Sequence, residues 1–314
     1  MRLRGVLFPV WSHIERLAMV PHPIPYQGSK RGLARLISYH VPNEIDVWYE
    51  PFAGSAAMSL WIAQNRMPRK IVLGDSLVPM VELWKAIIAD PERVADEYAG
   101  TWQGQMSADA TYFNVVRERY NNFADPVDLL YLTCRCVKNA VRFNAKGMFT
   151  QSVDKRRLGM KPDKMRRELL GAEALLRGRA EVREGDWLVT TADADTRDFI
   201  YMDPPYFGTS MGRDRRYAEW MSQERLIGGL RALRERGLRF SLSYDGQCGD
   251  RTYGPPLPVE LGMTRLLLHA GRSSQATLNG ERAETYESLY LSHGLGMSVA
   301  PTQPSFAGLD RLAA

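Results

Sequence analysis

Cysteine and histidine are sparse in this sequence. Its 314 residues include three cysteines, Cys134, Cys136 and Cys248, and five histidines scattered along the chain. Three cysteines give neither an even disulfide framework nor a paired CxxC metal site, and scattered histidines give little support for a metal centre. We therefore expect structural roles for these residues and no bound metal.

Long hydrophobic runs are also lacking. The longest early apolar run, Val6–Val10, is far too short for a membrane span or a signal-peptide core. The sequence has no internal repeat and no long low-complexity tract. With 45% apolar and 25% charged residues, the composition is that of an ordinary globular protein. We expect a cytoplasmic protein that does not bind membranes.

Positive charge is concentrated in one part of the chain. Residues 135–179 hold 13 Lys and Arg residues against four acids, a net charge of +9, whereas the whole chain carries +5. Such a concentration is typical of a surface that binds a polyanion. On charge alone, a solvated helical face is an equally good interpretation.

Strand and helix patterns alternate on both sides of a helical insert. Such alternation predicts right-handed βαβ units and an α/β fold with a mostly parallel sheet. The strands are expected at 46–50, 71–73, 199–202, 239–243, 264–269 and 286–291. The sheet would occupy 21–89 and 180–293, and the insert 90–179. Residues 1–20 form an N-terminal extension, and 294–314 are expected to be a disordered tail.

One helix of the insert is predicted over 127–141, because its apolar residues recur at core-facing spacing. Arg135, Lys138 and Arg142 would share its opposite face. We therefore expect this helix to pack on one side and to meet phosphate groups on the other.

The strongest local motif is Asp203-Pro204-Pro205-Tyr206, directly after the apolar segment 199–202. Ligands bind at the carboxyl ends of strands in open α/β sheets. The Asp203 carboxylate and the Pro204 carbonyl can accept hydrogen bonds from a base amino group, because the prolines fix the backbone direction. Tyr206 offers a face on which an extruded base can stack. A surface turn after a strand is the alternative.

A second motif, Tyr49–Ala56, follows the first predicted strand. Its small residues would let a cofactor approach the backbone closely. Asp75 ends the next strand, where doubly wound folds hold ribose hydroxyls. A helix N-cap is the other interpretation of Asp75, and one carboxylate can serve both purposes.

The ordered set of motifs resembles the Dam-type (alpha-group) DNA adenine N6-methyltransferases over roughly residues 24–293. The elements that match the family, in its order, are Tyr26-Gln27-Gly28-Ser29-Lys30, Glu50-Pro51-Phe52-Ala53-Gly54, Gly74-Asp75, Arg142–Phe149, Gly185-Asp186-Trp187, Asp203-Pro204-Pro205-Tyr206, and Arg272-Ser273-Ser274 with Asn279-Gly280. An ordered set of this kind is far more specific than any single motif.

The resemblance implies an enzyme that methylates N6 of a flipped-out adenine in double-stranded DNA. It implies a Rossmann-like, S-adenosylmethionine-dependent methyltransferase sheet with an inserted helical target-recognition domain, as a monomer or weak dimer. The catalytic residues would be Asp203, Pro204, Pro205 and Tyr206. S-adenosylmethionine would be bound by Tyr26, Gly28, Lys30, Glu50, Phe52, Gly54, Asp75, Asp186, Trp187 and Asp203. DNA would be bound by Arg135, Lys138, Arg142, Asn144, Lys146, Arg272 and Asn279.

Two of these residues have simpler interpretations. Lys30 on spacing alone could be a solvated lysine at a helix start, and Asn144 could cap a turn. The sequence also departs from the family at two places. Ala56 stands where a second glycine is usual, and residues 150–154 replace an Asn-Val-Pro-Phe-Gly-like stretch of the recognition region. A GATC recognition site is therefore not assumed.

Other functions remain open at this point. Methylation of cytosine N4 uses the same chemistry, but that family more often has Ser at the position of Asp203. Methylation of a protein glutamine usually goes with Asn there and leaves the basic insert unexplained. A DNA-binding relative without activity is the alternative from another class, and the intact Lys30, Asp75, Asp203 and Tyr206 argue against it.

Overall fold

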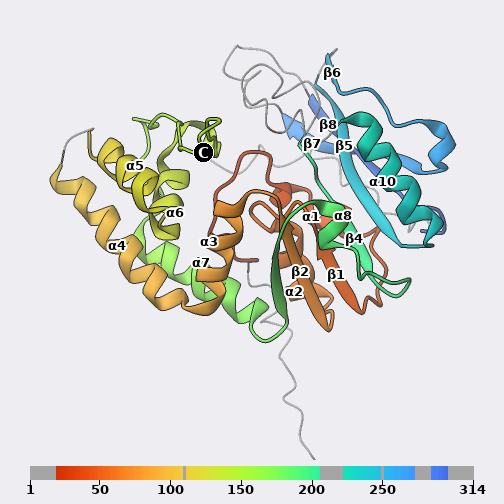
Figure 1. Ribbon diagram of the computed structural model, residues 1–314, viewed down its shortest axis with the longest axis horizontal. Coiled ribbons are helices and arrows are strands. Elements are labelled where there is room, and N and C mark those ends of the chain that lie inside the picture. Colours follow the sequence, from red (N-terminus) through yellow and green to blue (C-terminus); the bar gives the residue numbers. More distant parts are fainter. Residues whose placement is uncertain (1–18, 109–110, 206–221, 249–250, 273–283, 296–314) are drawn as a thin grey trace, which may run out of the picture.

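The computed structural model of the protein describes residues 19–108, 111–205, 222–248, 251–272 and 284–295. In these residues eight strands form one sheet in the order β3-β2-β1-β4-β5-β8-β7, and β6 pairs with β5 (Figure 1). The strands are β1 (Val47–Glu50), β2 (Lys70–Asp75), β3 (Ala180–Glu184), β4 (Phe199–Met202), β5 (Phe240–Cys248), β6 (Arg251–Tyr253), β7 (Thr264–Arg272) and β8 (Glu284–Leu291). The predicted Rossmann-like α/β fold is confirmed.

The five strands β3, β2, β1, β4 and β5 run parallel to one another, whereas β8 and β7 are antiparallel to their neighbours. The central strands β1 and β4 are buried at every residue, as expected when helices cover both faces of a parallel sheet. The strand order reverses between β1 and β4. At such a switch point a crevice opens beyond the carboxyl ends of the strands.

Alternate residues of the central strands belong to two hydrophobic cores, because successive side chains of a strand point to opposite faces. Trp48 and Tyr201 lie in the larger core with the helices α2 (Ala57–Asn65) and α3 (Val78–Ala89). Tyr49 and Met202 lie in the smaller core, with Trp187 of α8 (Trp187–Thr190) and leucines of α10 (Gln223–Glu235). The short α1 (Ala34–Ser38) adds Ile37 to the larger core.

The sequence patterns missed two strands, β3 and β6. In β3, Glu181 and Arg183 pair with each other, and Glu181 also pairs with Lys70 of β2. Such charges hide the apolar alternation by which strands are recognised. Among the described strands, β3 pairs with β2 alone, and a strand at the end of a sheet tolerates such charges.

The insert contains the four helices α4 (Pro91–Ser107), α5 (Tyr112–Phe123), α6 (Pro126–Arg135) and α7 (Pro162–Leu176), which lie together beside the sheet (Figure 1). Three of them begin at a proline, whose fixed φ suits the first helical position and whose missing N–H is no loss there. Asp90 and Asp125 cap α4 and α6 by accepting hydrogen bonds from backbone N–H groups.

The predicted helix over 127–141 is wrong at its carboxyl end, because α6 ends at Arg135. Cys136 is extended and forms an isolated bridge with Val153, and Val137 N donates to Ser152 O. Lys138 then adopts a left-handed φ of 61°. Tertiary pairing thus overrides the helical periodicity, and Arg135, Lys138 and Arg142 do not share a helix face.

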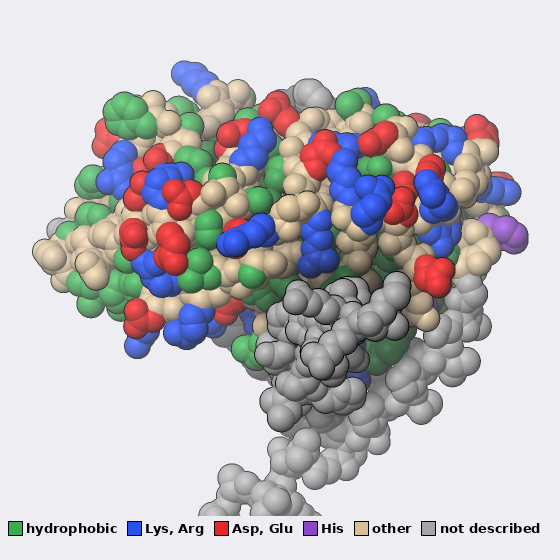
Figure 2. All heavy atoms as spheres, turned by 90° about the horizontal axis from the view of Figure 1, so that it is seen from below, with side chains coloured by type: hydrophobic (Ala, Val, Ile, Leu, Met, Phe, Trp, Pro, Cys, Tyr) green, Lys and Arg blue, Asp and Glu red, His purple; other side chains and the backbone are tan. Residues whose placement is uncertain are grey.

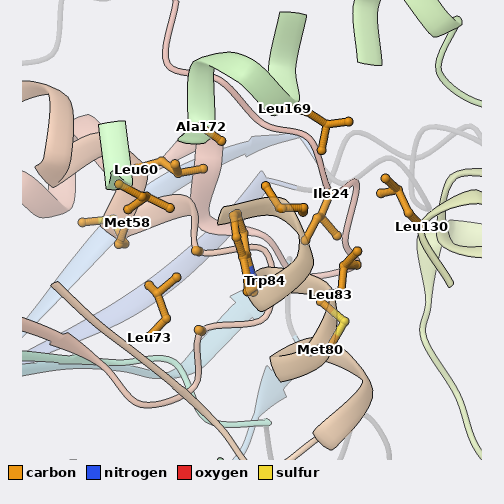
Figure 3. Close-up of a cluster of buried hydrophobic side chains, with 14 of the residues drawn as sticks. Ile24, Met58, Leu60, Leu73, Met80, Leu83, Trp84, Leu130, Leu169 and Ala172 are labelled. Carbon is orange, nitrogen blue, oxygen red and sulfur yellow. The ribbon is translucent and has the colours of Figure 1, made fainter. Parts of the chain in front are cut away.

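Sheet and insert are packed around the same core. Figure 3 shows Trp84, Met80 and Leu83 of α3 together with Leu130 of α6 and Leu169 and Ala172 of α7. All of these side chains are at most 1% exposed. The helical insert is therefore held to the sheet by apolar packing and not by a linker alone. In the part of the chain that the structure describes, no helix is long and apolar enough to cross a membrane.

Candidate active site

The turn after β1 lies against the segment around Tyr26 and against the end of β2. Gly54 has a φ of 47°, and its N–H donates to Asp75 Oδ2 at 2.9 Å. A Cβ at Gly54 would lie 3.3 Å from the Tyr26 ring. Trp84 Nε1 donates to the Gly54 carbonyl at 2.8 Å. The turn is thus fixed from both sides, and only glycine suits its close contact with the tyrosine.

Ala56 also adopts a left-handed conformation, with φ 49° and ψ 36°. A Cβ makes that conformation costly by about 1 kcal/mol. This cost explains why a second glycine is usual at this position in the Dam-type family. We expect Ala56→Gly to leave the free energy of unfolding unchanged or to raise it by up to about 1 kcal/mol. In the helix α2 that follows Ala56, Ala63→Gly should lower the free energy of unfolding by about 1 kcal/mol. Urea denaturation of both variants would test the pair, and equal losses would contradict it.

Asp75 is held by the backbone on two sides. Its Oδ1 accepts from Leu77 N at the entrance of α3, and its Oδ2 accepts from Gly54 N, both at 2.9 Å. Burial raises the pKa of this carboxyl, while these N–H groups oppose the shift. Asp75 therefore holds the backbone at the entrance of α3. Each carboxylate oxygen keeps a second lone pair, so contact with a ribose hydroxyl stays a prediction.

Asp203 follows β4 directly and pairs with Lys30, whose ammonium lies 2.8 Å from Asp203 Oδ1. Lys30 Nζ also lies 3.4 Å from Glu287 Oε2 of β8 and 3.1 Å from the Gly28 carbonyl. Burial raises the pKa of Asp203 to about 6; Lys30 opposes this shift and Glu287 adds to it. The solvated interpretation of Lys30 is wrong, because this residue is 5% exposed. Sequence reasoning missed Glu287, because no local signal marks this acid of β8 as a partner of Lys30.

Glu50, at the end of β1, is buried and accepts hydrogen bonds from the backbone N–H and the hydroxyl of Ser59 in α2. Burial raises the pKa of Glu50 to about 8, the Ser59 donors oppose the shift, and the Asp203 charge adds to it. Glu50 therefore ties β1 to the start of α2 and lies within electrostatic range of Asp203.

The segment Gly185–Trp187 is less open than predicted. Asp186 caps α8 by accepting from Leu188 N, and it pairs with Arg225 of α10 at 2.8 Å. Trp187 is 2% exposed and packs on Phe52 with a centroid distance of 6.1 Å. Its buried Nε1 has no hydrogen-bond partner among the described residues. Phe52 is only half-buried, so it is the member of this pair that an adenine ring could contact.

The predicted DNA-binding residues fall into two groups. Lys138, Arg142, Asn144 and Lys146 are exposed, and the last three lie in a hairpin in which Phe143 forms an isolated bridge with Phe149. The Asn144 side chain caps the hairpin turn by accepting from the N–H groups of residues 146 and 148, as the turn interpretation predicted.

Arg135 belongs to the second group. It is 8% exposed and donates to the Asp154 carbonyl, so it is not a surface cation. Three other arginines of the basic segment also have carboxylate partners: Arg156 and Arg157 pair with Asp154, and Arg166 pairs with Glu92 and Asp96 of α4. The charge count over residues 135–179 included Asp154, Arg156 and Arg157, but it left out Glu92 and Asp96 of α4.

The side chains of three predicted site residues are not described by the structure. Tyr206 and Asn279 lie outside the described residues, and of Arg272 only the backbone in β7 is described. In the described residues, no group of three or more His, Cys, Asp or Glu side chains is placed to hold a metal ion.

A family model described as D12 class N6 adenine-specific DNA methyltransferase matches residues 26–266. Type II methyltransferase M.FokI of Planomicrobium okeanokoites is 25% identical over 238 residues, and modification methylase StsI of Streptococcus sanguinis is 24% identical over 235 residues. Each alignment covers 71% of this chain and 35% of the relative. Type II methyltransferase M.MjaIII of Methanocaldococcus jannaschii is 22% identical over 199 residues, which cover 58% of this chain and 68% of the relative. The chain therefore spans about a third of the length of the first two relatives.

Proposed function

Because this chain belongs to the family of D12 class N6 adenine-specific DNA methyltransferases, we propose that it transfers a methyl group from S-adenosylmethionine to N6 of adenine in double-stranded DNA. The observation that carries this proposal is the Asp203 carboxylate, which follows β4 at the switch point of the sheet and is paired with Lys30.

The chemistry asks for two hydrogen-bond acceptors beside the amino group. The adenine N6 lone pair is delocalised into the ring, and acceptors on its two hydrogens favour the nucleophilic geometry. Asp203 supplies a carboxylate, and the Pro204 carbonyl supplies the second oxygen, because Pro205 restricts the backbone conformation of Pro204. Asp203, with a pKa of about 6, can also hold the proton that the amino group loses. Tyr206 completes the proposed catalytic set.

The residues around the β1 turn fit S-adenosylmethionine. A Cβ at Gly28 would meet nothing within 4 Å, whereas Gly54 is closed off by Tyr26, so open space lies beside a fixed turn. We place the cofactor there, against Tyr26, Phe52, Gly54 and Asp75. When bound, it supplies a methyl group already activated by the sulfonium, so that positioning contributes much of the rate. Lys30 stays a proposed cofactor residue, and its ammonium also contacts Asp203 and Glu287.

The target adenine is proposed to leave the duplex and to approach Asp203, since the amino group of a stacked, paired base cannot reach a carboxylate that is only 19% exposed. The exposed hairpin residues Arg142, Asn144 and Lys146 are proposed to face the DNA, with Lys138 beside them. On the face seen in Figure 2, Lys and Arg side chains are interspersed with Asp and Glu. No single-sign field therefore covers that face.

The experiment that tests the function is direct. Plasmid DNA is incubated with the protein and S-adenosylmethionine, and modified bases are mapped by single-molecule sequencing. We expect N6-methyladenine at one recurring sequence. Methylation of cytosine N4 would replace the proposed substrate with another base, and unmodified DNA despite cofactor binding measured by calorimetry would favour an inactive DNA-binding relative.

The proposed DNA interface gives a second test. Lys138, Arg142 and Lys146 have no carboxylate partner among the described residues. Replacing all three with alanine should weaken binding to any DNA sequence and lower the slope of log K against log salt by about 2 to 3, because each lost phosphate contact removes about one released counterion. Arg197→Ala, an exposed cation before the amino end of β4, is the matched control and should leave the slope unchanged. An unaltered slope in the triple variant would remove these residues from the interface.

A further inference from the structure

We propose that Glu287 is a positioning residue of the methyl-transfer site, which acts on the Asp203 carboxylate through the Lys30 ammonium. This inference rests on the proposed function, and it adds to the site a residue of β8, which lies two strands from β4 in the sheet.

The contacts join three separate parts of the chain. Lys30 lies in the 3-10 turn Lys30–Gly32 and is 5% exposed. Its ammonium is 2.8 Å from Asp203 and 3.4 Å from Glu287, whose side chains are 19% and 23% exposed. A largely buried ammonium needs acceptors on several sides, because each unmet donor carries a desolvation cost. Glu287 and the Gly28 carbonyl therefore fix the direction from which Lys30 meets Asp203.

The strand geometry brings Glu287 to this place. β8 pairs with β5 so that Glu287 lies opposite Gly246, and the register shifts between Ser243 and Gly246. A Cβ at Gly246 would lie 2.8 Å from the Tyr286 carbonyl, so only glycine allows this approach of the two strands. Bulges of this kind change the direction of side chains and occur often beside active sites.

Charge gives Glu287 a second effect on Asp203. Among the described residues, Lys30 and Glu287 both act on the charge of Asp203, and Asp203 in turn acts on Glu50 of β1. If Lys30 were paired with Asp203 alone, its full charge would stabilise the Asp203 carboxylate. That carboxylate would then be a weaker hydrogen-bond acceptor for the amino group. Because Glu287 shares the cation, Asp203 keeps more of its proton affinity. The pKa of about 6 is consistent with that sharing.

The test is the pH dependence of single-turnover methyl transfer. In the wild type the rate should fall as the pH drops through about 6, because protonated Asp203 loses its accepting charge. Glu287→Gln should move this acid limb to lower pH by about one unit, since the undivided Lys30 charge then favours the carboxylate. Its plateau rate should fall roughly tenfold or more, because Lys30 is less well oriented. Lys30→Met should move the limb in the opposite direction.

Glu284→Gln is the matched control. Glu284 lies in the same strand, but three residues away, so it points to the other face of the sheet, where it pairs with His269. This variant should keep the wild-type limb and plateau. A Glu287→Gln limb that coincides with the wild-type limb would leave Glu287 as a structural ion-pair partner only and would overturn the proposal.

A second readout separates this proposal from the proposed function. The Asp203 carboxyl can be titrated by carbon-13 NMR in the DNA-free protein, without any turnover. Absence of N6 methylation in the wild type would defeat the function, whereas the NMR titration would still report whether Glu287→Gln lowers the pKa of Asp203. An unchanged titration midpoint would defeat the coupling even in an active enzyme.

Discussion

Asp203→Ala is expected to reduce methyl transfer by about 10³-fold or more while the protein still folds and binds S-adenosylmethionine. The substitution removes the carboxylate that would accept the N6 hydrogen, and loss of one preorganised electrostatic group in an active site typically costs about 10²–10³-fold in rate. It also removes the contact between Lys30 and Asp203 while Glu287 remains near Lys30, so the ammonium would meet the amino group with the wrong charge. Single-turnover rates with saturating DNA and cofactor would measure the loss.

The control for this experiment is Asp195→Ala. Asp195 is exposed, precedes β4 at the opposite edge of the sheet, and pairs with Arg197. It should leave the rate within about twofold of the wild type, because surface ion pairs contribute little. Near-normal turnover by Asp203→Ala, with cofactor affinity intact, would defeat the mechanism and not merely the choice of one residue.

Trp84→Ala should lower the free energy of unfolding by about 3–5 kcal/mol, the usual cost of removing a large buried aromatic side chain. Trp84 is 1% exposed, and its ring lies where α3 meets the core shared with α6 and α7 (Figure 3). The substitution therefore removes packing from the sheet and from the insert together. Chemical denaturation followed by circular dichroism would measure it.

Trp84→Phe separates packing from hydrogen bonding. It keeps most of the apolar ring but loses the Nε1 donor to the Gly54 carbonyl, which costs about 1–3 kcal/mol when a buried acceptor loses its partner. Because Gly54 shapes the proposed cofactor turn, this variant should also weaken S-adenosylmethionine binding measured by calorimetry. A change in stability with no change in cofactor affinity would show that the turn keeps its conformation without Trp84.

The sequence was informative where chemistry and local backbone geometry coincide. The turn glycine at 54, the acid at 75 and the Asp203-Pro204-Pro205 segment were predicted at the ends of β1, β2 and β4, and the structure places them there. These positions can be read locally, because a left-handed turn needs glycine and parallel strands present their carboxyl ends at one edge.

The sequence was less informative where long-range contacts decide. Nothing local distinguishes Glu287 from any other strand acid, since its meeting with Lys30 depends on the register of β8 against β5. Likewise, the apolar spacing typical of a helix continues beyond Arg135 in the sequence. The helix itself ends at Arg135, because Cys136 and Val137 pair with residues 152–153. The buried Arg135 shows the same limit, because charge counts cannot tell which cations face inward.

The order of the last strands has a consequence for how this molecule matures. β7 is synthesised before β8, yet β8 lies between β5 and β7 in the sheet. Until β8 is in place, the edge of β5 that pairs with β8 presents open hydrogen-bonding groups to which another strand could add, and the contact between Lys30 and Glu287 cannot form. The pairing of β8 with β5 therefore completes both the sheet and the contacts of Lys30, and it is a long-range pairing of the kind that forms slowly. A chain that stops short of β8 would therefore expose the β5 edge and would lack the contact between Lys30 and Glu287.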